Sequence, residues 1–293
     1  TAYEIKECDW SSDVCSSDLF LTANVGKVVI GGTFINVGAV TRGRVARLNA
    51  DGTLDNTFLN GLAGADNTVD AVAVQNDGKV VLVGSFSTVN GVSRGGVARL
   101  NADGTLDTGF LNGLSGADAE VRAVLVDEAN GYIYVGGDFT SVNGTARSRV
   151  ARLVLSSGAL DNTYTPPSGI NGAVRALALA GNGDLLVGGD FTSVGGSGRN
   201  RLARLNGSGT LQSFLSAGGE GADNFVTALW VSGGKLLVGG AFGTLNGQVR
   251  NAVARLNDDG SLDATVNFGT GANGQVNAVG VQGDGRLVVA GAF

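Results

Sequence analysis

The chain has 293 residues, 43% of them apolar, and a net charge of −6, so it is long enough to bury one or two hydrophobic cores. It contains no histidine and only two cysteines, Cys8 and Cys15, which excludes Ser/His and Cys/His nucleophile pairs, imidazole metal sites and a four-thiolate zinc site. We therefore expect no cofactor and no metal; the even spread of arginines argues against a nucleic-acid partner, and the lack of an apolar run of about 18 residues argues against membrane insertion.

The first residues of the chain differ from the rest. Residues 9–19 read D-W-S-S-D-V-C-S-S-D-L, which matches no later segment and resembles the translation of a common short-read sequencing adapter. We expect residues 1–19 to be a non-native or disordered tail that makes few contacts with the rest of the chain; the alternative is a linker or a degraded first strand. Because the chain has no methionine, we also expect it to be a fragment of a longer protein.

Residues 20–293 consist of a repeat of about 52 residues. A G-x-F element recurs every 51 to 53 residues and ends at Phe34, Phe86, Phe139, Phe191, Phe242 and Phe293. A second element, [VL]-A-R-L, keeps the same phase, with its arginine at Arg47, Arg99, Arg152, Arg204 and Arg255.

The second copy shows the strands that we expect in each repeat. Val69 to Val74 is an apolar, β-branched run, and Lys79 to Phe86 is another, so the two predict a hairpin. The Asp77-Gly78 pair between them supplies the positive φ angles of a two-residue type I′ turn, a place that later copies fill with Gly183, Gly234 and Gly285. After a longer loop, 96–101 and 106–110 predict a third and a fourth strand around a second Asp-Gly turn.

Four antiparallel strands in about 52 residues are typical of one blade of a β-propeller. The sequence therefore predicts an all-β fold, a fragment of a β-propeller with about five four-stranded blades over residues 20–293, truncated at both ends and flanked by further blades or domains. In a propeller the first strand of each blade lies nearest the axis. The main alternative is a β-solenoid, whose rungs would be shorter and would not need two hairpin turns per repeat.

The repeat also carries a resemblance to a known family. The pattern V-x-A-[VL]-x-[VL], then [DN]-G-[KR] before an apolar run that ends in G-G-x-F, then [VL]-A-R-L and G-[TS]-L-D, resembles the delta-60 repeat family of bacterial β-propeller-like proteins over residues 20–293. The resemblance implies a large secreted or cell-surface bacterial protein, although no signal peptide is visible, and implies no catalytic activity, ligand or cofactor.

Positions that recur in every copy are expected to stabilise the fold, because every blade packs against its neighbours in the same way. We expect the G-x-F phenylalanines to fill the space between blades. Two arginine columns are expected to tie strands together by pairing with recurring acids or loop carbonyls, rather than to capture an anion. Asp66, Asp118, Asn171, Asp223 and Asn273 are interpreted as Asx-turn caps at the start of the first strand, with calcium binding as the weaker alternative.

One position varies between copies within this constant frame. The second residue of the first strand is polar and differs from copy to copy, which predicts a side chain that faces the central channel and contacts water or a ligand. These predicted ligand-binding residues are Asp70, Arg122, Arg175, Thr227 and Asn277. We assign no catalytic residue.

The sequence leaves two hypotheses for the function of the chain. The first is a non-enzymatic binding or adhesion module of a secreted or surface bacterial protein, with an unidentified protein or glycan as its partner. The second is a hydrolase or lyase that acts on glycans with paired carboxylates. Its candidate carboxylates are Asp138, Asp190, Glu120 and Glu220.

Overall fold

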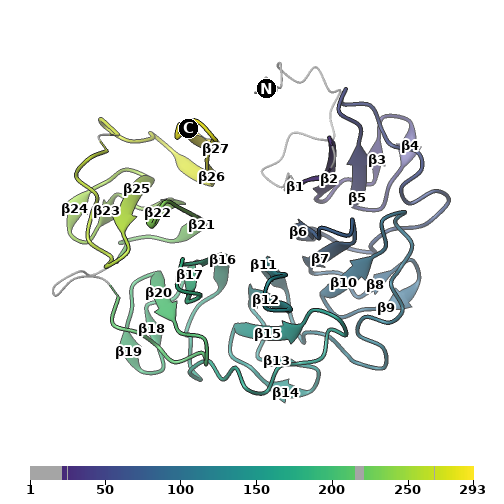
Figure 1. Cartoon of the computed structure of the whole chain (residues 1–293), viewed down its shortest axis with the longest axis horizontal. Coiled ribbons are helices and arrows are strands. Elements are labelled where there is room, and N and C mark those ends of the chain that lie inside the picture. The colour runs from purple at the N-terminus through teal and green to yellow at the C-terminus, as the bar shows by residue number, and fades with distance from the viewer. Residues whose placement is uncertain (1–21, 25, 215–220, 267) are drawn as a thin grey trace.

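The computed structural model of the chain describes residues 22–24, 26–214, 221–266 and 268–293. The predicted tail, 1–19, lies outside the described residues, and so does Glu220. The described residues form strands, turns and bends and contain no helix. The fold is a β-propeller whose sheets follow one another around an open arc, with the first and last sheets facing each other across the opening (Figure 1).

The first five main sheets each contain three antiparallel strands, and the last contains two. The first strand of each sheet lies nearest the centre of the arc: β1 (Thr22–Asn24), β6 (Val69–Val74), β11 (Val121–Asp127), β16 (Val174–Leu179), β21 (Val226–Ser232) and β26 (Gln275–Val281). The second strands are β2 (Lys27–Gly31), β7 (Val80–Gly84), β12 (Tyr132–Gly137), β17 (Leu185–Gly189), β22 (Lys235–Gly240) and β27 (Leu287–Ala292). The third strands are β5 (Val45–Leu48), β10 (Val97–Leu100), β15 (Val150–Val154), β20 (Leu202–Leu205) and β25 (Val253–Asn257).

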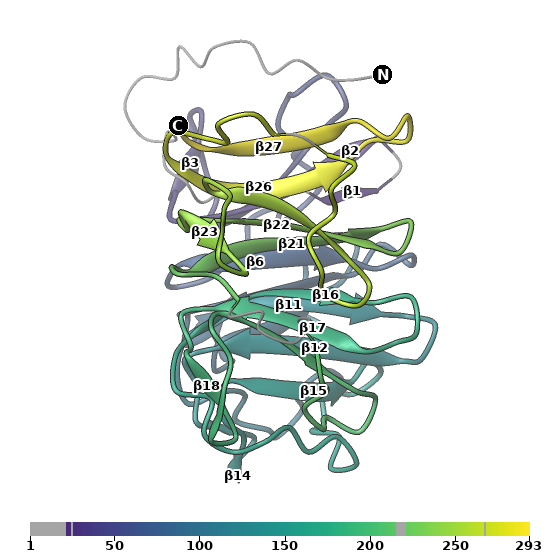
Figure 2. The same ribbon diagram turned by 90° about the vertical axis from the view of Figure 1, so that its left-hand side faces the viewer.

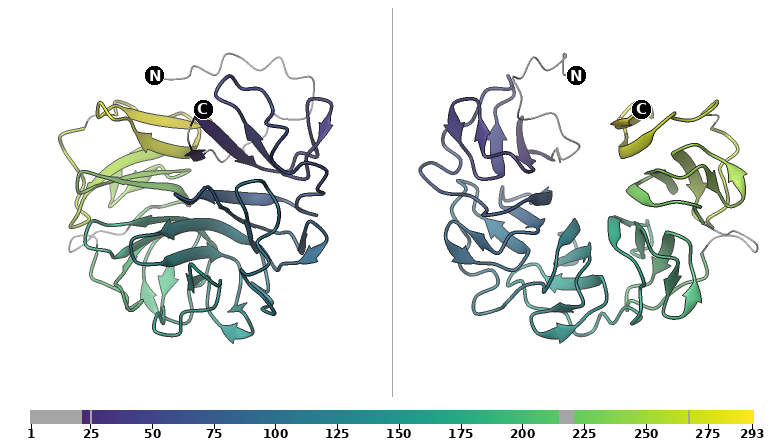
Figure 3. Two further views of the ribbon diagram at one scale, coloured as in Figure 1. Left: turned by 45° about the vertical axis from the view of Figure 1, so that its right-hand side comes forward. Right: turned by 180° about the vertical axis from the view of Figure 1, so that it is seen from behind.

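The predicted hairpin of the second copy is confirmed. Strands β6 and β7 pair antiparallel from Val69↔Gly84 to Val74↔Val80, and the later copies pair in the same way. The solenoid alternative requires parallel rungs, so this register rules it out for these segments. Seen from the side, the sheets lie one above another as layers (Figure 2), and from other directions they form one continuous arc (Figure 3).

The predicted fourth strand is wrong for the described residues. Residues 106–110 form no strand, and only Leu106 makes a single bridge to Leu100; Leu54, Leu160, Leu211 and Leu262 do the same in the other copies. In four copies the Asp residue that follows this leucine comes just before a turn that ends the pairing.

The loop after each second strand contains a small hairpin that the sequence analysis did not predict. These hairpins pair β3 (Asn36–Val37) with β4 (Val40–Thr41), β8 (Thr88–Val89) with β9 (Val92–Ser93), β13 (Ser141–Val142) with β14 (Thr145–Ala146), β18 (Ser193–Val194) with β19 (Ser197–Gly198), and β23 (Thr244–Leu245) with β24 (Gln248–Val249). They lie on the outer side of the arc (Figure 1).

The number of inner strands also differs from the expectation. The sequence predicts about five blades, whereas β1 pairs with β2, so the described residues contain six first strands. The described residues therefore contain five sheets of three strands and a final sheet of two, β26 and β27.

The predicted type I′ turn is wrong in most copies. Gln75 and Lys79 are hydrogen-bonded to each other, so the loop is the three residues 76–78, and only Gly78 has a positive φ, +82°. This geometry is a type I turn followed by a left-handed glycine. A two-residue loop with positive φ at both positions occurs at Gly233 and Gly234, φ +56° and +70°.

The core is a series of layers between neighbouring sheets. One layer joins Val29 and Val45 of the first sheet to Val69, Leu82 and Phe86 of the second, and the next sheets repeat the arrangement. The predicted packing of the G-x-F phenylalanines is confirmed for five of them, from 0% to 7% exposed, and burying each ring stabilises the fold by about 1.5–3 kcal/mol. Phe293, at the end of the final sheet, is 53% exposed.

Candidate functional site

The second residue of each inner strand lies at a β-bulge. Pairing skips from Val69 to Ala71, and the same shift occurs at Val121/Ala123, Val174/Ala176, Val226/Ala228 and Val276/Ala278. A bulge takes one residue out of the regular alternation and redirects its side chain. The five predicted ligand-binding residues occupy this bulged position.

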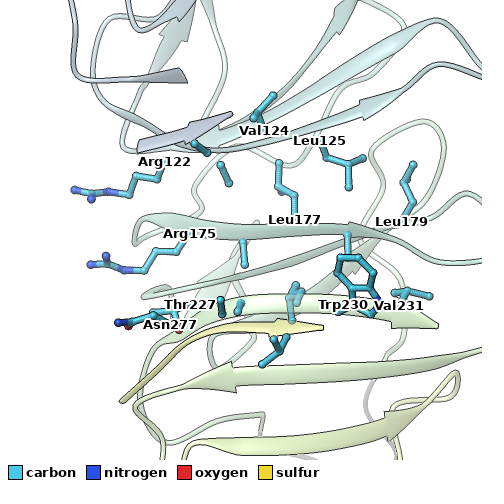
Figure 4. Close-up of a pocket in the computed structure, with 18 of the residues that line it drawn as sticks. Arg122, Val124, Leu125, Arg175, Leu177, Leu179, Thr227, Trp230, Val231 and Asn277 are labelled. Atoms are coloured by element: carbon cyan, nitrogen blue, oxygen red, sulfur yellow. The ribbon is translucent and has the colours of Figure 1, made fainter. Parts of the chain in front are cut away.

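The inner strands line a cavity of about 490 Å³. Four of the five predicted residues, Arg122, Arg175, Thr227 and Asn277, lie in its wall (Figure 4). Asp70 does not belong to the wall, although its neighbours Ala71 and Val72 do. The structure thus brings four of the five side chains together; their role in binding a ligand stays a prediction.

Arg122 lies between two carboxylates. Its Nη2 is 2.6 Å from Oε2 of Glu120 and 2.7 Å from Oδ2 of Asp138, and its Nε donates to the same Asp138 oxygen at 2.8 Å. A second arginine, Arg149, approaches the other oxygen of Asp138 at 3.4 Å. The charge of Arg122 is therefore compensated within its own sheet.

Arg175 makes a bidentate ion pair with Asp190. Its Nε and Nη2 donate to the two carboxylate oxygens at 2.7 and 2.8 Å, and its guanidinium lies 5.4 Å from the centre of the Phe225 ring. The hydrogen bond with Asp190 raises the pKa of Arg175, and the charges of Asp138 and Glu120 raise it further although burial lowers it. The two arginines and their acids thus form one electrostatic network at one mouth of the cavity.

The two uncharged residues at this mouth are also engaged. Thr227 Oγ1 donates a hydrogen bond of 2.5 Å to the carbonyl oxygen of Val276, on the inner strand of the next sheet. Asn277 Oδ1 accepts a hydrogen bond of 2.5 Å from Gln275 Nε2. The polar mouth is therefore held by contacts within the protein.

The rest of the cavity wall is apolar, and the sequence analysis did not identify its exposed tryptophan. Trp230 of β21 lines the cavity and is 46% exposed, beside Leu125, Leu179 and Val231 at the end away from the arginines (Figure 4). The signal was present in the sequence, because the fifth position of the inner strand varies as much as the second: it reads Ala73, Leu125, Ala178, Trp230 and Gly280.

The carboxylates of the enzymatic alternative are held in these ion pairs. Asp138 and Glu120 contact Arg122, and Asp190 contacts Arg175. Each described candidate acid therefore has an arginine partner.

The A-R-L arginines act as the predicted ties. Each Nε donates to an acid of the same sheet at 2.7 to 2.9 Å: Arg47 to Asp55, Arg99 to Asp107, Arg152 to Asp161, Arg255 to Asp263 and Arg204 to Asp184. Four of them also reach a carbonyl of the following sheet, at Ala102, at Leu155 and Ser156, at Gly207 and at Asp258. Aromatic rings cover several guanidinium groups, for example Phe110 over Arg99 at 4.5 Å.

The other arginine column meets the expectation only in part, because its members contact carbonyls and not acids. In the described part of the chain these arginines form no ion pair, and each donates from Nη1 to the carbonyl of the residue before it: Arg42, Arg94, Arg147, Arg199 and Arg250. Arg42 and Arg147 also donate from Nη2 to the side-chain oxygens of Asn56 and Asn162, at 3.4 and 3.1 Å. These two arginines therefore link the outer hairpin to a later loop of the same repeat.

The recurring Asp66 column caps a distant loop instead of the strand beside it. Asp66 Oδ1 accepts from the backbone N–H groups of Ser87 and Thr88, and Oδ2 accepts from the Ser87 hydroxyl. Burial alone would raise the pKa of Asp66, but these hydrogen bonds hold it at about 2. Asp118 and Asn171 make the same contacts in the next two copies, so the local Asx-turn interpretation is wrong for these three residues.

Among residues 22–24, 26–214, 221–266 and 268–293, no three acidic or cysteine side chains gather in a group that could hold a metal ion. The same residues include no helix with the length and apolar character to span a bilayer.

Comparison with known proteins supports the propeller fold. A family model described as "Domain of unknown function (DUF5122) beta-propeller" matches residues 26–58, 75–110 and 234–265, and one described as "Rax2 C-terminal beta propeller domain" matches residues 103–228. Neither description mentions the delta-60 repeat, so that resemblance stays a prediction. The chain is thus a β-propeller domain similar to those of Rax2 proteins.

One curated relative and several solved structures are similar to the chain. The "Polarized growth protein L1" of a Phoma species is 28% identical over 168 residues, which is 54% of this chain but 12% of that protein. The matched part of the chain therefore spans about an eighth of the length of that relative.

The solved structures are similar in fold only. The WD40 propeller domain of Doa1 has a TM-score of 0.57 at 14% identity, with 90% of this chain and 71% of that chain covered. A gluconolactonase from Xanthomonas campestris has a TM-score of 0.52 at 18% identity, covering 90% and 79%. The computationally designed Ika8 protein has a TM-score of 0.52 at 17% identity, covering 92% and 81%.

Proposed function

We propose that this chain is a non-enzymatic binding or adhesion module of a secreted or cell-surface protein, with its ligand in the central channel. One observation carries the proposal: the positions that vary between copies, Arg122, Arg175, Thr227, Asn277 and Trp230, meet in one cavity. The recurring A-R-L arginines and G-x-F phenylalanines lie in the scaffold. A wall that differs from sheet to sheet on a repeated frame suits recognition of one asymmetric ligand.

The relatives agree with a binding or structural role. The similar Phoma protein is named for polarized growth, and the second family model describes a propeller of Rax2. We propose a protein or glycan as the partner. The bacterial source that the sequence analysis expected stays a prediction, since the curated relative is fungal.

A blocked channel tests this proposal. Ala278 lines the cavity and is exposed, so Ala278→Trp should fill the channel without disturbing the core. Val249→Trp is the matched control, because Val249 is 68% exposed on the outer hairpin β24. Panels of oligosaccharides and of polypeptides are screened against the immobilised chain by interferometry.

We expect at least one ligand to bind the parent and the Val249→Trp variant and to lose binding to the Ala278→Trp variant. If no member of either panel binds, or if every bound ligand also binds the blocked variant, the proposal is wrong. Hydrolysis of a glycan by the parent that is abolished by Asp138→Asn would instead establish the enzymatic alternative.

A further inference from the structure

The charged groups of the channel leave little for a charged ligand to bind. Arg122 is held by Glu120 and Asp138, and Arg175 by Asp190. A ligand carboxylate or ammonium group would have to displace one of these pairs, whose separations are 2.6 to 2.8 Å. A ligand that enters the channel is therefore expected to be uncharged where it meets the wall.

The backbone supplies the polar groups that remain. Among the described residues, β16 pairs only with β17 and β21 only with β22, and the free edges of these inner strands face the centre of the arc (Figure 1). An edge strand presents a row of N–H and C=O groups to whatever lies beside it. The carbonyl of Val276, on the inner strand β26, already accepts a hydrogen bond from the Thr227 hydroxyl of the neighbouring sheet.

The apolar end of the channel supplies the side-chain contacts. Trp230 projects from β21 into the cavity and remains 46% exposed, whereas Leu125, Leu179 and Val231 beside it are half-buried (Figure 4). An exposed tryptophan inside a cavity offers a large apolar surface with only two side-chain torsions to order. It is the natural anchor for an apolar ligand group.

We propose that the channel binds an extended, uncharged polypeptide segment with apolar side chains, which lies along the free edge of β21 and covers Trp230. The main chain of the segment hydrogen-bonds to the edge of β21, and an apolar side chain packs on the indole, which is the strand-addition mode of peptide recognition. This inference rests on the proposed function and names its ligand class.

An oligosaccharide suits this wall less well. A sugar ring would stack on Trp230, but its hydroxyl groups would need side-chain partners around the ring. The polar side chains of the wall, Arg122, Arg175, Thr227 and Asn277, lie at the other mouth and already have partners within the protein. The alternating donors and acceptors of a strand edge match a peptide main chain instead.

The fluorescence of Trp230 gives a direct test. The chain has two tryptophans, so Trp10→Phe leaves Trp230 as the single tryptophan, which is excited selectively at a wavelength that tyrosine does not absorb. This variant is titrated with a capped pentapeptide of alternating threonine and valine, with the same peptide methylated on its backbone nitrogens, and with cellohexaose. Affinities are repeated by calorimetry on Trp230→Ala, with Val249→Ala as the matched control.

We expect the unmethylated peptide to shift the emission saturably to shorter wavelength, and Trp230→Ala to weaken its binding at least about tenfold while Val249→Ala leaves it unchanged. The methylated peptide should not bind. Equal binding of both peptides would overturn strand addition, and unchanged affinity of Trp230→Ala would overturn the site. A shift with cellohexaose alone would replace the ligand class but keep the proposed function. No shift with any probe would overturn this inference, and the blocked-channel experiment would then decide the proposed function separately.

Discussion

Arg204 shows how one side chain keeps its role when its usual partner is lost. In the sheets of Arg47, Arg99 and Arg255 the acid follows the leucine that bridges to the third strand. A lysine at or just before the start of the second strand contacts the same acid. In the sheet of Arg204, Gln212 occupies the place of that acid and Asp184 the place of the lysine. The carboxylate now comes from the position before the second strand, and Arg204 Nε donates to it at 2.7 Å, as Arg99 Nε donates to Asp107 at 2.9 Å.

Because the acid and the lysine have exchanged places, a second substitution should restore the stability that the first one removes. Asp184→Lys removes a partner whose side chain is 15% exposed from an arginine that is 9% exposed, so it should lower the free energy of unfolding by about 3 kcal/mol. Adding Gln212→Asp recreates the arrangement of Lys79, Arg99 and Asp107 and should recover most of the loss. Urea unfolding of the parent, both single variants and the double variant measures the coupling energy between the two positions. If the changes in the free energy of unfolding are purely additive, Asp184 and Gln212 have not exchanged roles with the lysine and the acid of the other sheets.

The lowered pKa values of Asp66 and Asp118 predict that the stability of the fold depends on pH. Their hydrogen bonds with serine and threonine hold each folded-state pKa at about 2, below the unfolded value of about 3.9, although burial acts in the opposite direction. The stabilisation by each carboxylate is therefore complete above pH 4 and is lost as the pH falls through 2. Carbon NMR of the side-chain carboxyls should give midpoints near 2 for both residues, and Ser87→Ala should raise only that of Asp66. Midpoints near 3.9 in the parent would show that the caps do not form in solution.

Within each hairpin, the close approach of its two strands depends on glycine. A Cβ atom on Gly84 of β7 would overlap the carbonyl oxygen of Thr68, just before β6. In the next hairpin, a Cβ on Gly136 would lie 2.5 Å from Cγ1 of Val174, on the inner strand of the following sheet. The first contact lies within one sheet and the second between sheets, so the G-G pair sets both spacings.

A matched pair of substitutions tests this role. Gly84→Ala should lower the free energy of unfolding by about 3 kcal/mol, because the backbone of Thr68 must move. Gly181→Ala is the control: a Cβ there meets no atom within 4 Å, and the change should stay within about 1 kcal/mol. Equal unfolding midpoints in urea for the two variants would show that the hairpin accepts a wider spacing.

The repeat made most of the strand arrangement predictable, and its departures have local causes. The six G-x-F phenylalanines fixed the period and the hairpin register, because one packing solution recurs in each sheet. The fourth strand failed because a turn-forming Asp follows the leucine that makes the last bridge in most copies. The outer hairpins are only two residues per strand, too short for an alternation to be recognised.

The candidate site was predictable only in part, because several of its features depend on contacts between residues far apart in the sequence. Variation at the second inner position pointed to the cavity, and Arg122, Arg175, Thr227 and Asn277 do line it. The bulge that redirects these side chains has no signature in the sequence, and the ion pairs of the two arginines depend on Asp138 and Asp190, sixteen and fifteen residues away. Trp230 was missed because an apolar residue in an inner strand looks like core until the burial of its neighbours is known.

The whole molecule is an arc held together by contacts between successive sheets. Each inner valine packs on the preceding sheet, and the A-R-L arginines cross to the following one. At the final sheet these contacts are missing from the described residues: Val288 and Phe293 are 46% and 53% exposed, whereas the equivalent Val81 and Phe86 are 0% and 2% exposed. Stability should therefore be a sum over neighbouring sheets.

Recurring side chains hold the propeller together, and variable side chains line the channel. The melting temperatures of Arg99→Ala and Arg122→Ala test this division most directly. Arg99 is 5% exposed, pairs with Asp107 and crosses to Ser156, so its loss should cost about 3–5 kcal/mol and lower the melting temperature by about 10 °C. The Arg122 side chain is 27% exposed beside acids that water also reaches, so its loss should lower the melting temperature by less than about 3 °C. An unchanged melting temperature for Arg99→Ala together with a large drop for Arg122→Ala would reverse the assignment of scaffold and site.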